Sequence, residues 1–305
     1  MNKHFSDMTN DDSYIVNSLS LITFDKLMVD KAINDDHISL EGGLFGVVKE
    51  LGGKISNFFS GLFKRIKALL NISEMINSYW ESGIDKDVIN SIKTFKKLSS
   101  DLEYNDIALL EIPVTMGLRT KALPLMTFLE KESASFVKRY MVFMEQFDTD
   151  LSEFISIEDF RTRFSSNNDD KEEKYLQKFN GELISLLNVK QYGAKATFDD
   201  LYGSRSALDD SLNMSAKIYK SISEKEFKKA TLLIRDVKPK LDALYDLIEI
   251  EKEPVSKAAL RSIINRVELA SDYTTILGKL GLLIYETSKQ SVDTVAIIKA
   301  IKDNG

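Results

Sequence analysis

Residues 118–147 read LRTKALPLMTFLEKESASFVKRYMVFMEQF, and this stretch decides the fold class. Apolar or aromatic side chains recur in it at steps of three, four or seven residues: Leu118, Ala122, Leu125, Leu129, Phe136, Tyr140, Phe143 and Phe147. Such spacing places one apolar face along an α-helix. We therefore predict a long amphipathic helix that starts or bends near Pro124, because proline is tolerated in the first turn of a helix and kinks its interior.

The same spacing returns near the end of the chain. It predicts a second long helix with its apolar positions at Ile263, Val267, Ala270, Leu277, Ile284, Val295 and Ile298. Between the two long helices, a polar break at 165–170 precedes a helix over 171–187, and residues 191–203 read as a connector. A further helix begins at Ser223 with a capping-box pattern, in which Ser223 is paired with Glu226 three residues later, and ends before Pro254.

Apolar and polar residues nowhere alternate strictly over a long run, and the chain has only 14 glycines and 4 prolines. We therefore expect an all-α fold, a multi-helix bundle with long amphipathic helices. More than half of the residues should be helical, with at most a token strand.

Composition restricts the function. The 305 residues carry a net charge of -6, so the whole-molecule basic footprint of a nucleic-acid-binding protein is missing. The chain has no cysteine, and its two histidines, His4 and His37, lie near the N-terminus. These counts exclude disulfides, a cysteine nucleophile, and a Ser–His or His–metal centre in the body. We expect no enzyme, no cofactor and no metal site.

No targeting or membrane-spanning segment stands out. The first apolar run, near residues 15–22, contains Asn and Ser and follows acidic residues, which are the wrong flank for a secretory signal. A run of about 18 uninterrupted apolar residues, as a transmembrane helix needs, does not occur.

Charge divides the chain into three regions. Residues 1–41 form an acidic N-terminal tail with eight acids, three bases and one marginal helical pattern, a net charge of -5. Residues 42–72 form a cationic amphipathic helical segment, whose portion up to residue 70 carries +4. Residues 73–305 form the helical body. We expect the tail to pack poorly compared with the body, since it holds most of the excess negative charge.

The cationic segment reads GGLFGVVKELGGKISNFFSGLFKRIKALL over 42–70. Its apolar residues recur at helical spacing, and glycine pairs offer a break at Gly52-Gly53. Two interpretations remain open: a core helix with a solvated cationic face, or a helix that contacts a bilayer interface or an acidic protein groove. The opening Gly-Gly-Leu-Phe-Gly resembles membrane-active and fusion-type peptides. The contact residues in the second interpretation are Phe58, Phe59, Leu62, Phe63, Lys64, Arg65 and Lys67.

The junction between the first two regions reads Ile38-Ser39-Leu40-Glu41 and then Gly42. It resembles the processing sites of prohead proteases in large tailed bacteriophages, which cut after Glu in short motifs. The resemblance implies cleavage between Glu41 and Gly42 and makes residues 1–41 a propeptide. The sequence ISIE at 155–158 satisfies the same pattern, so the charge reversal and the glycine pair are what favour the first copy.

The segment from Asp148 to Asp159 resembles an EF-hand calcium loop, with oxygen-bearing side chains at positions 1, 3 and 5. It departs from the pattern where the geometry is strictest. Glu153 stands at position 6, where the loop needs glycine, and the shorter Asp159 stands at position 12. We expect a degenerate loop or an acidic helix end without calcium.

These observations favour a non-enzymatic virion structural or internal head protein of a large tailed phage, located in the virion or the host cytoplasm and matured by removal of residues 1–41. Its expected partners are other virion or assembly proteins, further copies of itself and a membrane surface, with no specific nucleic acid. Two alternatives remain. One is a membrane-active helical protein, either a pore-forming toxin or an ejection component. The other is a helical scaffold that binds a protein partner.

Overall fold

The computed structural model describes residues 81–99, 102–114, 122–152, 169–187, 195–222 and 257–304, and six single helical positions between 229 and 243. Within these residues the chain is 88% helical, with seven helices and one two-stranded sheet. The predicted all-α fold is confirmed for this part of the chain, and the token strand expected from the sequence is a pair of three-residue strands.

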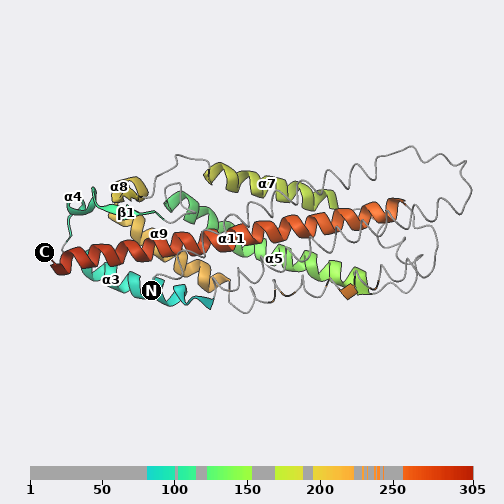
Figure 1. Ribbon diagram of the computed structural model, residues 1–305, viewed down its shortest axis with the longest axis horizontal. Helices are drawn as coiled ribbons and strands as arrows, with labels where there is room; N and C mark the ends of the chain where they lie inside the picture. Colours follow the sequence, from blue (N-terminus) through green and yellow to red (C-terminus); the bar gives the residue numbers. More distant parts are fainter. Residues whose placement is uncertain are drawn as a thin grey trace, which may run out of the picture.

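Two long helices form the axis of the molecule (Figure 1). Helix α5 spans Ala122–Ser152, and helix α11 spans Lys257–Asn304 with 48 residues, a length of about 70 Å at 1.5 Å per residue. They are antiparallel, because Arg139 and Asp150 of α5 contact Tyr273 and Arg266 of α11 respectively. Both predicted long helices are confirmed, and Pro124 lies in the first turn of α5, where its missing N–H breaks no intrahelical bond.

Helix α7, Asp169–Leu187, packs against both long helices. It begins two residues before the start predicted from the sequence. Three acidic residues occupy its first turn, Asp169, Asp170 and Glu172, where the N-terminal end of the helix dipole favours negative charge. Its buried face carries Leu176, Phe179 and Leu183.

Helices α3, Ile84–Leu98, and α9, Arg205–Ser221, contact each other and α11, toward the end of the molecule where α11 terminates (Figure 1). Helix α3 begins after Gly83, whose φ of 78° is in the left-handed region that glycine adopts without strain. Ser204 caps the N-terminus of α9, since its hydroxyl accepts a hydrogen bond from the Ala207 N–H at 3.1 Å.

Short helices and strands lie at this end of the molecule. They are α4 (Tyr104–Ile107), β1 (Glu111–Pro113), β2 (Lys195–Thr197) and α8 (Phe198–Leu201). The two strands are antiparallel, with Ile112 opposite Ala196. The connector predicted over 191–203 therefore contains β2 and α8, and Thr197 caps α8 through a reciprocal pair of hydrogen bonds with Asp200.

The buried side chains form two groups. The large core combines the inner faces of α5, α7 and α11 with Ile218, Ile222 and Val237. The small core combines α3, α4, both strands, α8, the start of α9, and Val295 and Ile298 of α11. The predicted apolar positions of both long helices are buried wherever their exposure is described, except Phe143, which is partly buried against the large core.

Candidate functional site

The predicted processing junction, Glu41 and Gly42, lies outside the described residues. So do all seven predicted contact residues of the cationic segment: Phe58, Phe59, Leu62, Phe63, Lys64, Arg65 and Lys67. The regions 1–41 and 42–72 and the capping box at Ser223 lie outside them as well. These interpretations therefore stay predictions.

The first five positions of the EF-hand-like segment are the last turn of α5. Thr149 and Ser152 donate their hydroxyl hydrogen bonds to the carbonyl oxygens of Glu145 and Asp148 one turn earlier, which is a helical pattern. Asp148 forms an ion pair with Lys240. The described part of the segment is thus an acidic helix end, one of the two outcomes expected from the sequence, and the side chains that would begin a calcium loop have other partners.

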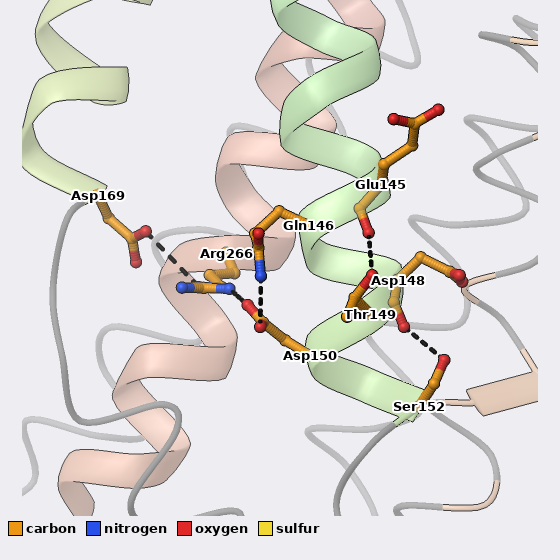
Figure 2. A network of polar contacts seen from close by, with 8 residues as sticks. All are labelled: Glu145, Gln146, Asp148, Thr149, Asp150, Ser152, Asp169 and Arg266. Atoms are coloured by element: carbon orange, nitrogen blue, oxygen red, sulfur yellow. Dashed lines mark hydrogen bonds and ion pairs between the residues drawn. The ribbon is translucent and has the colours of Figure 1, made fainter.

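Arg266 joins three helices at this helix end (Figure 2). Its Nη1 forms an ion pair with Asp150 on α5, and its Nε lies 3.6 Å from Asp169 Oδ1 on α7. Gln146 Nε2 donates a hydrogen bond of 2.8 Å to the other carboxylate oxygen of Asp150. We call Asp150, Asp169 and Arg266 the Arg266 cluster.

A second charged group lies further along the same three helices. Arg139 on α5 donates two hydrogen bonds of 2.9 Å to the two carboxylate oxygens of Glu172 on α7. Tyr273 on α11 donates its hydroxyl to Glu172 and accepts a 3.2 Å hydrogen bond from Arg139 Nε. The Arg139 guanidinium also lies 3.9 Å from the ring centroid of Tyr175, a cation–π contact. We call Arg139, Glu172 and Tyr273 the Arg139 cluster.

The Arg139 cluster shifts the protonation of its own members. Burial alone would raise the pKa of Glu172, but the hydrogen bonds from Arg139 and Tyr273 and the Arg139 charge hold the pKa of this carboxyl below its ordinary value. Burial and the hydrogen bond to Glu172 raise the pKa of Tyr273. A phenol with a raised pKa stays protonated at neutral pH, so Tyr273 serves here as a hydrogen-bond donor rather than as a nucleophile.

A third polar group lies along α11 between the two cores. Its hydroxyls come from Ser211 and Ser215 of α9 and from Thr287, Ser288, Ser291 and Thr294 of α11, all fully buried. We call these six residues the hydroxyl layer. Ser211 and Ser291 hydrogen bond across the two helices at 2.9 Å, and Tyr202, whose pKa burial raises to about 12, donates to Ser291 at 3.3 Å.

None of these groups was predicted from the sequence. Arg139 and Arg266 stand beside predicted apolar positions, Tyr140 and Val267, and that is a weak signal because long cationic side chains often lie along apolar surface with their charge in water. The hydroxyls of Thr287, Ser291 and Thr294 continue the helical spacing of Ile284, but serine and threonine are usually exposed and so read as surface.

Searches among known proteins give no further lead. No protein-family model, no curated protein and no solved structure matches this chain.

Among the described residues, no three or more His, Asp or Glu side chains are placed to hold a metal ion. The adjacent carboxylates Asp199 and Asp200 have structural partners, since Asp199 accepts a hydrogen bond from Tyr104 and Asp200 caps α8. No helix in the same residues is long and apolar enough to span a membrane. The Arg139 and Arg266 clusters join helices to one another.

Proposed function

We propose that this chain is a non-enzymatic structural protein of a virion, an internal head protein of a large tailed phage that matures by cleavage between Glu41 and Gly42. The observation that carries the proposal is the junction itself. A short motif ending in Glu coincides with the point where the net charge changes from -5 over residues 1–41 to +4 over residues 42–70.

The described body supports a structural role. Its two charged clusters each connect α5, α7 and α11, and their side chains are engaged with one another rather than directed at an open site. An elongated helical bundle braced in this way suits a protein that packs among others in a particle. The acidic tail would neutralise the cationic segment until its removal, after which residues 42–70 become free to contact other head proteins.

The N-terminus of the protein isolated from its native particle tests the proposal. We expect N-terminal sequencing to begin at Gly42 and the intact mass to match residues 42–305. The variant Glu41→Gln should stay uncut when it is produced together with the particle's protease. The matched control is Glu158→Gln at the second copy of the motif, which should still be cut at Glu41. A mature protein that retains residues upstream of Gly42 would contradict the proposal.

A membrane-active protein is the second candidate, and the cationic amphipathic segment favours it. A peptide of residues 42–70 should then gain helicity on vesicles with anionic lipid and bind less strongly as salt rises, because its net charge of +4 acts through screened attraction. In the full chain, Phe59→Ala should leave the free energy of unfolding nearly unchanged. A peptide that ignores vesicles, together with a loss of about 3–5 kcal/mol in Phe59→Ala, would indicate a buried core helix instead.

A further inference from the structure

The Arg266 cluster contains two carboxylates and one guanidinium in a place with little water. The side chains of Asp150, Asp169 and Arg266 are exposed by only 11–16%. If both acids are ionised, the cluster holds an excess negative charge, and burying an incompletely compensated charge is unfavourable. A proton taken up by one of the two acids would remove the excess.

The two carboxylates are not equally well bound. Asp150 receives Arg266 Nη1 on one oxygen and the Gln146 amide on the other. Asp169 Oδ1 lies 3.6 Å from Arg266 Nε, and its buried Oδ2 accepts no hydrogen bond from any residue that the structure describes. A proton would therefore disrupt fewer contacts at Asp169 than at Asp150, so Asp169 is the acid that we expect to bind it.

The neighbouring acids on α7 also favour a proton on Asp169. On its own helix, Asp170 and Glu172 face it with like charge, and Glu172 is in turn bound by Arg139 and Tyr273. Facing it from α11 is Arg266, which Asp150 of α5 also binds. Burial first, and then the repulsion by Asp170 and Glu172, raise the pKa of Asp169 above its ordinary value.

We propose that Asp169 is a proton-binding switch that tightens the docking of α7 on α5 and α11 as the pH falls below neutral. Its folded pKa lies above the unfolded one, so the folded state holds the proton more tightly, and this acid's contribution to stability rises as the pH falls through the folded pKa. Glu172, with a lowered pKa, loses its stabilising contribution only at lower pH. At pH values between the folded pKa of Asp169 and that of Glu172, the docking of α7 on α5 and α11 is therefore strongest.

The urea midpoint of the full chain, measured from pH 7.5 down to about pH 4, tests the switch. The variant Asp169→Asn keeps the shape of the side chain but cannot ionise. We expect its midpoint to exceed that of the unmodified chain at pH 7.5, and the difference to shrink toward zero near pH 4, where an ordinary aspartate takes up its proton. The matched control, Asp210→Asn at an exposed position on α9, should preserve the pH profile of the unmodified chain. A lower midpoint for Asp169→Asn at pH 7.5, or a difference independent of pH, would overturn the proposal.

Two measurements on the unmodified chain do not depend on that variant folding. Carbon NMR of aspartate-labelled protein should show the Asp169 carboxyl titrating above the ordinary aspartate range, and titration within or below that range contradicts the switch. Hydrogen exchange, corrected for its intrinsic pH dependence, should show protection of the α7 amides rising more than protection in α3 as the pH falls through the titration of Asp169 seen by NMR. Equal changes in α7 and α3 would show that the proton does not act on the docking of α7.

Discussion

The two ends of the helical bundle pack α11 in opposite ways. Against α5 and α7, α11 contributes Tyr273 to a group of aromatic rings, in which the Phe136 centroid lies 4.6 Å from Phe179 and 5.5 Å from Tyr273. Against α9, the same helix contributes the serines and threonines of the hydroxyl layer. Burying large rings removes much apolar surface from water, whereas a buried hydroxyl has to recover its lost hydration through a hydrogen bond. We therefore expect the α5–α7 end, where α11 packs against α5 and α7, to contribute most of the free energy of unfolding. At the α9 end, stability should depend on whether each buried hydroxyl keeps its hydrogen-bond partner.

The largest effect should come from removing a ring at the aromatic end. Phe136 is fully buried, and Phe136→Ala should lower the free energy of unfolding by about 3–5 kcal/mol, because the large cavity can only partly collapse. Val142→Ala on the exposed face of the same helix is the control, with a change of about 0.5 kcal/mol or less. Urea denaturation measures both, and a small loss in Phe136→Ala would remove the contrast between the two ends.

The Arg139 cluster should contribute less than the rings around it. Glu172→Gln should cost about 1 kcal/mol at neutral pH, a modest figure because solvent screens this partly exposed pair. The lowered pKa of Glu172 makes its contribution present above the pKa of an unfolded glutamate and lost as the pH falls through the folded value. The cost should therefore disappear in acid. The exposed neighbour Glu173→Gln serves as the control, and a cost for Glu172→Gln that persists in acid would argue against the ion pair.

The hydroxyl layer should respond in a non-additive way. Ser291→Ala removes the described partner of the Ser211 hydroxyl and leaves the Tyr202 hydroxyl only its longer contact with Thr294, and it should cost about 1 kcal/mol. The double variant Ser211→Ala/Ser291→Ala removes both sides of the helix–helix bond and should cost less than the two single variants together. A double-mutant cycle measures the coupling. Strict additivity would mean that the two hydroxyls do not depend on each other.

The smallest effect should come from the surface of the strand pair. Lys195 and Glu111 form an ion pair of 2.9 Å, but both side chains are more than 60% exposed. Lys195→Gln should leave the urea midpoint unchanged within error, since solvent and salt screen such a pair. A clear loss of stability would show that the strand pair depends on this contact more than its exposure implies.

Periodicity was informative where one helix face meets a core along its whole length. The spacing from Leu125 to Phe147 and from Val267 to Ile298 predicted both long helices. Apolar residues that repeat about every 3.6 positions share one face, and can be buried together, only if the segment is a helix. The same reasoning treated 191–203 as a connector and so missed β2, whose three residues are too few to show an alternating pattern.

The sequence did not predict the Arg139 cluster, the Arg266 cluster or the hydroxyl layer. Arg139 and Glu172 are 33 residues apart, and Arg139 and Tyr273 are 134 apart. Nothing local distinguishes a charged residue that meets such a partner from one that faces water. The EF-hand-like pattern shows the same point, since its acidic residues were visible but their partners, Lys240 and Arg266, were not.

The sequence by itself determined the helical class, the positions of the long helices and the faces that they bury, because backbone geometry turns the spacing of apolar residues into a face. It also determined the absence of cysteine and the charge reversal at Glu41 and Gly42. Only the tertiary structure decided which charges are paired, that a layer of hydroxyls is buried, and that Arg266 lies between two carboxylates. Pairing and desolvation are properties of what surrounds a side chain, and the packing of distant helices sets those surroundings.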